Sequence, residues 1–263
     1  MLNVGSTSRP KQDFFGIGFS QFDGLDDAMY AIEAADPAAI DEFRYVVTPN
    51  ADHIVRMTDR PGLLDIYNKA WLCLNDSRIV QLLLRLGGFD LPVIRGSDLV
   101  ARMLGSQWLR GKRIVVVGGD ETLHRWLQCL TAPESIFHYN PPMGFISTRN
   151  GLENVVDFIE QRLPAFVFLA VGSPNQEIVA DACVRRGLRG GVALCVGAGL
   201  LMAAGIEKRA PAFMRFVGLE WLYRLAQDPR RLAGRYCRDF RIFRLAAREI
   251  IRERSLPPYG QQP

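Results

Sequence analysis

Residues 113–121 read RIVVVGGDE, and this stretch decides the class of fold. Four consecutive β-branched residues stand at 114–117, a pattern typical of a strand that is buried on both faces of a sheet. Two glycines follow, and a helix is then predicted up to about residue 130. A buried strand that leads through a glycine turn into a helix is the repeating unit of a parallel α/β sheet.

The same alternation of strand and helix recurs along the chain on both sides of this unit. Further strands are predicted at 15–19, 45–47, 71–74, 135–139, 165–171 and 192–196, with helical segments between them. A strand about every 25 to 30 residues predicts βαβ units. We therefore predict an α/β fold with a Rossmann-like, mainly parallel sheet and helices on both of its faces.

Polar and small residues follow five of the predicted strands. They stand at 48–50, 75–77, 118–120, 172–176 and 197–199. Ligands of parallel sheets bind at the carboxyl ends of the strands, so these positions are candidates for a binding site. Ordinary turns are rich in the same residue types, so the pattern is also compatible with a purely structural role.

Asp76 is the candidate catalytic residue that the strand pattern singles out. It follows the short apolar strand WLCL at 71–74, where the sheet would open to a ligand. A carboxylate in that place can act as a general base on a hydroxyl group. The competing interpretation is a local role, as an Asx-turn residue or a helix N-cap.

Several site motifs are absent from the 263 residues. The GGD turn fits neither GxGxxG nor GxxxxGK[ST], so a dinucleotide site or a P-loop is poorly supported, and a plain strand-to-helix turn is the alternative. No GxSxG elbow, DxD pair or HExxH motif occurs, which disfavours a serine hydrolase and a metal-bound nucleotide. We therefore expect no cofactor and no metal ion.

Composition and cysteine usage limit the remaining classes. The formal net charge is +4, and 48% of the residues are hydrophobic, as in an ordinary globular protein. The five cysteines stand far apart without a CxxC pair, which is neither a zinc pattern nor a disulfide scaffold and suits a reducing compartment. No apolar run approaches the roughly 20 residues of a membrane span, and the N-terminus shows no secretory signal.

Positive charge is concentrated near the C-terminus. Residues 207–254 contain thirteen Lys or Arg and six Asp or Glu, whereas the rest of the chain is slightly acidic. No strand pattern remains in this region, and helices are predicted at 211–226 and 229–253. We therefore expect two parts, an α/β domain over 1–206 and a helical appendage over 207–263.

The last predicted helix is basic and amphipathic. At about 100° per residue, its aromatic and apolar side chains fall on one arc. The complementary arc holds Arg231, Arg235, Arg238, Arg241, Arg244, Arg248 and Arg252. Three interpretations fit such a helix: a solvated surface helix, a helix that contacts nucleic acid, or a helix that lies on an anionic membrane. Its aromatic residues favour the membrane over nucleic acid.

Taken together, these segments resemble the WecG/TagA/CpsF family of bacterial glycosyltransferases. The matching pieces are TPN at 48–50, WLCLNDS at 71–77, RGSDL at 95–99, VVVGGDE at 115–121, GSPNQE at 172–177 and VGAG at 196–199. The most specific piece is AGIEKRAPAFMRFVGLEWLYRLAQDPRRLAGRY at 204–236, and the resemblance covers roughly residues 14–238 in order.

The resemblance implies a Rossmann-like catalytic domain that moves a sugar, with inversion, from a UDP-sugar to a sugar linked to polyprenyl diphosphate. It implies Asp76 as the general base and Thr48, Asn50 and Gln176 as polar pocket residues. The glycine-rich turns would border the nucleotide, at Gly119, Asp120, Gly197 and Ala198. Arginines of the appendage would close over the site, at Arg209, Arg224, Arg230 and Arg231.

This implied activity agrees with the chemistry of the residues. An inverting transfer is a single displacement, so one carboxylate suffices to take the proton of the acceptor hydroxyl. The leaving UDP needs positive charge, and arginines can supply it by bidentate phosphate contacts in a chain without a DxD motif.

One position departs from the family pattern. Many members have Asp-Gly where this chain has Asp76-Ser77, and a serine beside the base would narrow or repolarise the sugar pocket. We therefore expect glucose or glucuronic acid rather than N-acetylmannosamine as the transferred sugar. It would be the second sugar of an exopolysaccharide or cell-wall polymer repeat.

The resemblance also implies a peripheral protein at the cytoplasmic face of the inner membrane. The expected partners are the UDP-sugar donor, the lipid-linked acceptor and an anionic membrane surface, and no nucleic acid is expected. The sequence leaves open whether the protein forms a homo-oligomer. Two other functions remain as alternatives. One is a non-catalytic nucleic-acid or membrane-binding module that uses the basic helix, and the other is a nicotinamide-dependent oxidoreductase, against which the missing GxGxxG argues.

Overall fold

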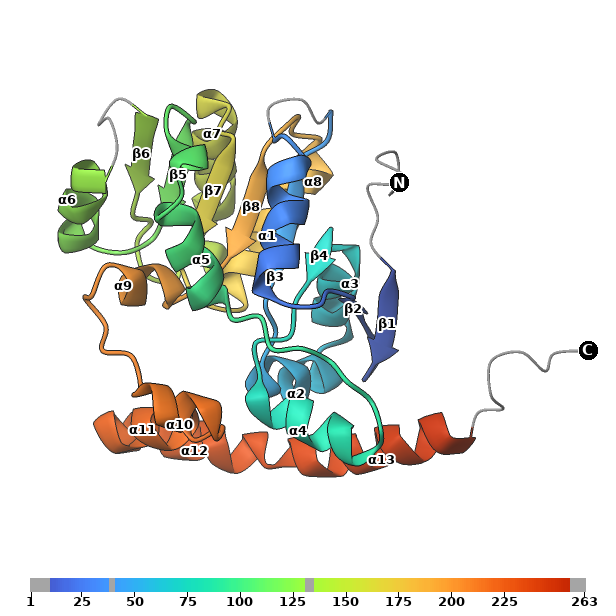
Figure 1. Ribbon diagram of the computed structural model, residues 1–263. Coiled ribbons are helices and arrows are strands. Elements are labelled where there is room, and N and C mark those ends of the chain that lie inside the picture. Colours follow the sequence, from blue (N-terminus) through green and yellow to red (C-terminus); the bar gives the residue numbers. More distant parts are fainter. Residues whose placement is uncertain (1–9, 38–40, 131–134, 256–263) are drawn as a thin grey trace, which may run out of the picture.

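A six-stranded parallel sheet forms the centre of the computed structural model, which describes residues 10–37, 41–130 and 135–255 (Figure 1). Its strands are β3 (Arg44–Val47), β4 (Leu72–Cys73), β5 (Ile114–Val117), β6 (Ile136–Tyr139), β7 (Phe166–Leu169) and β8 (Val192–Cys195). They lie in the order β4-β3-β8-β7-β5-β6, and every neighbouring pair is parallel. The predicted α/β class and parallel sheet are confirmed.

Each face of the sheet packs against its own apolar core. Val115 and Val117 of β5 belong to one core, and Ile114 and Val116 to the other, because successive side chains of a strand point to opposite faces. The first core is covered by α2 (Ala51–Asp59), α3 (Pro61–Lys69), α4 (Arg78–Leu86), α7 (Gly151–Arg162) and α8 (Asn175–Arg186). The second is covered by α1 (Leu25–Ala34), α5 (Gly96–Leu104), α6 (Glu121–Leu130) and α9 (Gly199–Ala203). Two short 3-10 turns lie at Gln107–Leu109 and Phe145–Ser147.

The N-terminal segment differs from its prediction. The single strand expected at 15–19 is an antiparallel hairpin of β1 (Lys11–Phe14) and β2 (Ile17–Ser20). The turn between them has positive φ at Phe15 and Gly16. Apolar side chains before and after this turn are buried, so the sequence pattern alone did not separate the two strands.

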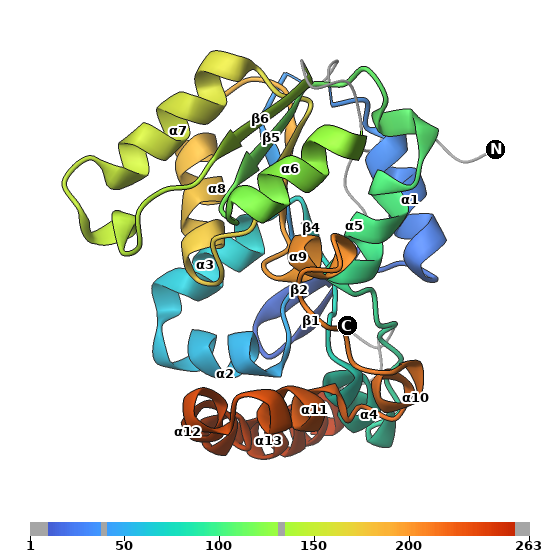
Figure 2. The same ribbon diagram turned by 90° about the vertical axis from the view of Figure 1, so that its left-hand side faces the viewer.

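Four helices complete the chain, where the sequence predicted two. They are α10 (Ala212–Phe216), α11 (Glu220–Gln227), α12 (Pro229–Asp239) and α13 (Arg241–Ser255). Gly218, at φ 82°, separates α10 from α11, since this left-handed conformation ends a helix and favours glycine. Figures 1 and 2 show the four helices as one layer beneath the carboxyl ends of the sheet, with α12 and α13 against α2 and α4.

Candidate active site

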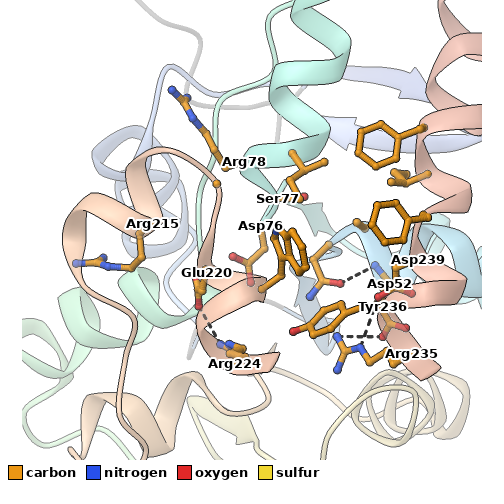
Figure 3. Close-up of a pocket in the computed structure, with 18 of the residues that line it drawn as sticks. Asp52, Asp76, Ser77, Arg78, Arg215, Glu220, Arg224, Arg235, Tyr236 and Asp239 are labelled. Atoms are coloured by element: carbon orange, nitrogen blue, oxygen red, sulfur yellow. Dashed lines mark hydrogen bonds and ion pairs between the residues drawn. The ribbon is translucent and has the colours of Figure 1, made fainter. Parts of the chain in front are cut away.

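A cavity of about 190 Å³ lies where the ends of β3 and β4 meet the C-terminal helices (Figure 3). Asn50 and Asp76 line it from the sheet, and Glu220 and Arg224 line it from α11. Pockets that enclose a whole drug-sized ligand measure roughly 300–1,000 Å³. The cavity therefore suits one sugar ring and the adjoining phosphate better than a complete sugar nucleotide.

The Asp76 carboxylate points into this cavity (Figure 3). Its neighbours Asn75 and Ser77 form the local turn and the helix cap. The Asn75 side chain accepts a hydrogen bond from Ser77 N–H (2.9 Å) and donates one to the Ser77 carbonyl (3.2 Å). The Ser77 hydroxyl accepts from Val80 N–H (3.2 Å) and caps α4, a contact worth about 1 kcal/mol. Within the described residues, no hydrogen bond or ion pair occupies the Asp76 carboxylate. The structure therefore assigns the turn and the cap to Asn75 and Ser77 rather than to Asp76, and the catalytic role of Asp76 stays a prediction.

The surroundings of Asp76 make it a stronger base than an ordinary aspartate. Burial, with a contribution from the nearby Glu220 carboxylate, raises the pKa of Asp76 to about 7, and Arg95 and Arg224 offset part of this effect. A general base works best when its pKa lies near the working pH. Asp76 is therefore electrostatically suited to take a proton from a hydroxyl group at neutral pH.

Five arginines line the same cavity: Arg78, Arg95, Arg215, Arg224 and Arg235. Arg95 comes from the body and reaches the C-terminal helices, where it donates a hydrogen bond to the Arg215 carbonyl (3.0 Å). The Arg215 guanidinium lies 4.0 Å from Asp98, a carboxylate that also pairs with Arg209. The cavity thus joins one base to a group of arginines, which suits an anionic substrate such as a diphosphate.

An aromatic wall closes the opposite side of the cavity. Trp221 contacts Tyr236 edge to face, with ring centroids 5.7 Å apart, and Phe240 and Phe243 stack at 5.9 Å. Phe240 and Phe243 are also exposed at the surface. A wall of this kind fits the apolar face of a sugar ring or the start of a lipid chain.

The far end of the cavity is a buried charge cluster that joins α2 to α12 (Figure 3). The Asp52 side chain, 2% exposed, pairs with Arg56 on its own helix and with Arg235 (3.3 Å) and Arg238 (3.9 Å) of α12. Although burial opposes its charge, Arg235 and Arg56 hold the pKa of Asp52 below the ordinary value. Burial, together with the Asp52 charge, raises the pKa of Asp239 to about 6.

A second ion pair joins α2 to the start of α13. The Arg241 guanidinium makes two hydrogen bonds to the Asp59 carboxylate, both of 2.8 Å. Arg235, Arg238 and Arg241 were expected on an outward basic face of the last helix. The structure instead turns them toward the body, where α2 presents carboxylates at Asp52 and Asp59.

The residues predicted for the donor side gather at the ends of β3, β7 and β8. The Gln176 side chain accepts a hydrogen bond from Gly197 N–H (2.8 Å) and donates one to Glu177 (2.9 Å). The Thr48 hydroxyl is buried and lies 3.4 Å from the Cys195 carbonyl, next to the chain at Gly96. Ala198 follows Gly197 at the start of α9. These residues form one edge of the site without lining the cavity around Asp76.

The remaining predicted site residues lie apart from that cavity. Gly119 and Asp120 follow β5, and the Asp120 carboxylate accepts hydrogen bonds from Thr122 and Leu123 N–H at the start of α6. Arg230 is exposed on α12. The side chain of Arg231 lies outside what the structure describes. Of the predicted set, Asn50, Asp76 and Arg224 line the cavity, and Arg209 reaches its border through Asp98.

Sequence reasoning did not assign roles to Arg95, Arg215, Glu220 and Asp52. Three of them stand inside segments that carry the resemblance: Arg95 in RGSDL at 95–99, and Arg215 and Glu220 in the segment at 204–236. Their position in these segments was the available signal. Nothing in the sequence showed that the two segments touch, since the Arg95 and Glu220 side chains meet across 124 intervening positions.

A parallel α/β sheet whose strand ends set a carboxylate near arginines suits a group-transfer enzyme. The sequence pattern of the Glycosyl transferase WecG/TagA/CpsF family matches residues 12–256, and the chain belongs to this family. It is therefore a glycosyltransferase. The alternatives of a non-catalytic module and of an oxidoreductase are not supported.

Named relatives of the chain are transferases of one kind. A protein of Bacillus spizizenii named N-acetylglucosaminyldiphosphoundecaprenol N-acetyl-beta-D-mannosaminyltransferase is 29% identical over 193 residues, 71% of this chain and 72% of the relative. Two proteins of Staphylococcus aureus with the same name are 26% identical over 193 residues, 72% of this chain and 74% of each relative. These names do not support the glucose or glucuronic acid expected from Ser77.

The described residues show neither a metal-binding cluster nor a membrane-spanning helix. Over residues 10–37, 41–130 and 135–255, no group of three His, Cys, Asp or Glu side chains is placed to hold a metal ion. Over the same ranges, no helix is long and apolar enough to cross a bilayer.

Proposed function

We propose that this protein transfers N-acetylmannosamine, with inversion, from its UDP-sugar to N-acetylglucosamine linked to polyprenyl diphosphate. The observation that carries the proposal is the cavity in which the Asp76 carboxylate lies near the charges of Arg95 and Arg224. The names of the relatives support this pair of sugars. The earlier reason for a glucose donor is weak, because the Ser77 hydroxyl is engaged in capping α4.

The proposed step is a single displacement. The acceptor hydroxyl loses its proton to Asp76 while its oxygen bonds to the anomeric carbon, and the bond from that carbon to the UDP oxygen breaks. The electron pair of the broken bond leaves with UDP, whose new charge is stabilised by arginine. Because guanidinium groups can supply this charge, we also propose that transfer needs no metal ion and proceeds in EDTA.

A panel of donors and acceptors tests the proposed reaction. UDP-N-acetylmannosamine, UDP-glucose and UDP-glucuronic acid are each combined with N-acetylglucosaminyl- and glucosyl-diphospholipid, and the products are identified by mass spectrometry and NMR. We expect product from UDP-N-acetylmannosamine and the N-acetylglucosaminyl acceptor, with inverted anomeric configuration. Transfer of glucose or glucuronic acid alone would contradict the sugar assignment, and retained configuration would contradict the single displacement.

We further propose that the C-terminal helices rest on an anionic membrane surface, where a lipid-linked acceptor resides. Two aromatic side chains of α10, Phe213 and Phe216, are 72% and 71% exposed. Phe240 and Phe243 are exposed at the cavity, and Arg244 and Arg248 are exposed on α13. Exposed aromatic residues combined with arginines are typical of helices that lie in a membrane interface.

Changing Phe213 and Phe216 together to Ser should weaken binding to phosphatidylglycerol vesicles by at least tenfold. Fully burying one phenylalanine contributes about 1.5–3 kcal/mol, and about 1.4 kcal/mol corresponds to a factor of ten. Vesicle co-sedimentation measures the effect. Tyr30→Ser, which removes an equally exposed aromatic side chain from α1, serves as the control and should bind as the unmodified protein does. Equal binding by the double variant would show that α10 does not contact the membrane.

A further inference from the structure

Glu220 brings a carboxylate from α11 into the part of the cavity that contains Asp76. It is the first residue of α11, and its side chain is 25% exposed. Figure 3 shows Glu220 and Asp76 directed toward the same part of the cavity, and the Glu220 carboxylate is close enough to help raise the pKa of Asp76. The proposed transfer requires only one base, so the presence of Glu220 needs a separate explanation.

The contacts of Glu220 are with arginines. Its Oε1 lies 3.0 Å from Nη2 of Arg224, one helical turn further along α11. Its Oε2 lies 3.9 Å from Nε of Arg95, which comes from the body of the protein. Glu220 is thus held between the two cations that most strongly oppose the basicity of Asp76.

The charged groups around Asp76 come from two parts of the chain. Arg224 and Glu220 approach from α11, and Arg95 and Asp98 approach from α5 and the residue before it. Asp98 lies 3.8 Å from Arg95 and also pairs with Arg209. Asp98 therefore shares its charge among several arginines, whereas Glu220 is the carboxylate that contacts both Arg95 and Arg224.

We propose that Glu220 is a positioning residue of the transfer reaction, whose carboxylate holds Arg95 and Arg224 beside Asp76 and keeps both guanidiniums off the base. The inference rests on the proposed function, because it assumes that Asp76 accepts the proton. It assigns different roles to the carboxylates and the arginines of the cavity. Asp76 stays unpaired and basic, and the arginines stay in place for an anionic substrate.

This role follows from competition between carboxylates. Without Glu220, the guanidinium of Arg95 or Arg224 would pair with the Asp76 carboxylate, because charge pairs are strong in a partly buried cavity. An arginine paired with Asp76 would lower the pKa of Asp76 by about 1–3 units and weaken the base. The increase of activity with pH would then begin at lower pH, and the maximal rate would fall.

Glu220→Gln tests the proposal directly, because it keeps the shape of the side chain and removes its charge. The carboxyl carbon of Asp76 is followed by NMR as the pH is changed, with its signal assigned by its absence in Asp76→Asn. We expect the titration midpoint of Asp76 to fall by about one unit or more. Arg224→Gln removes one of the cations and should move the midpoint in the opposite direction, to higher pH.

Two further variants act as controls. Glu207→Gln removes the same charge from an exposed position outside the cavity lining and should leave the midpoint unchanged. Glu220→Asp keeps the charge and should return the titration midpoint of Asp76 toward that of the unmodified protein. If Glu220→Gln does not fold, Glu220→Asp still shows whether a carboxylate at this position sets the midpoint. An unchanged or raised midpoint in folded Glu220→Gln would overturn the proposal. Because this titration is read without substrate, its result is independent of whether the proposed sugars are correct.

Discussion

Replacing Asp76 by Asn should abolish sugar transfer while leaving nucleotide binding intact. The amide cannot accept the proton of the acceptor hydroxyl, and a positioned general base accounts for about 10²- to 10⁴-fold in rate. Asp76 itself carries no structural contact that the change would break, since Asn75 and Ser77 form the turn and the helix cap. Product formation per enzyme measures the rate, and titration calorimetry with UDP measures binding.

The neighbouring residue provides a matched control for this experiment. Ser77→Ala removes the cap of α4 at a cost of about 1 kcal/mol in stability but leaves the Asp76 carboxylate in place. It should retain most of the activity at a temperature where it is folded. An Asp76→Asn protein that transfers sugar within a few-fold of the unmodified rate would exclude Asp76 as the base.

The pH dependence of the unmodified protein follows from the same carboxyl group. Asp76 must be deprotonated to act as a base, and burial raises its pKa to about 7. Transfer should therefore be slow at pH 6 and increase as the pH rises through about 7. An ordinary aspartate would show no change over this range, because it is already ionised.

Ending the chain after Lys208 should remove transfer completely and leave a folded α/β domain. The truncation deletes Arg215, Glu220 and Arg224 together with the aromatic wall, so Asp76 loses one whole side of its cavity. Among the described residues, the core beneath α1, α5 and α6 contains none from the deleted part, and the other core loses Ile242 as its buried member from α13. Circular dichroism and thermal unfolding check the fold, and the transfer assay checks the activity.

A shorter truncation is the control for the first. Ending the chain after Ser255 keeps every residue that lines the cavity and should keep the activity. If the chain that ends after Lys208 still transferred sugar to a lipid-linked acceptor, the cavity between the sheet and the C-terminal helices would not be the active site. A chain that lost both activity and cooperative unfolding would show instead that the body depends on these helices for its stability.

The sheet and the position of Asp76 could be predicted because they depend on local pattern. Runs such as IVVV at 114–117 are long enough and branched enough to mark buried strands, and a polar residue directly after one falls at the ligand edge of a parallel sheet. The hairpin of β1 and β2 was missed, since its turn at Phe15 and Gly16 lies within a continuous apolar alternation.

The partners of the charged residues could not be predicted in the same way. Periodicity placed Arg235, Arg238 and Arg241 on one arc of the last helix but could not say which side the arc faces. That side is decided by Asp52 and Asp59, which lie some 180 residues earlier in the chain. Likewise, the chemistry of Glu220 depends on Arg95, and a pair so distant in sequence leaves no local pattern.

The pairing of α2 with α12 and α13 also determines how relatives of this protein can be recombined. A junction drawn at the start of the C-terminal helices would separate Arg235, Arg238 and Arg241 from the two carboxylates that receive them. In a chimaera made there, the buried Asp52 would keep Arg56 but lose the cations of α12, and removing partners from a buried charge is destabilising. The transplantable unit is therefore discontinuous: it consists of the four C-terminal helices together with residues 51–59.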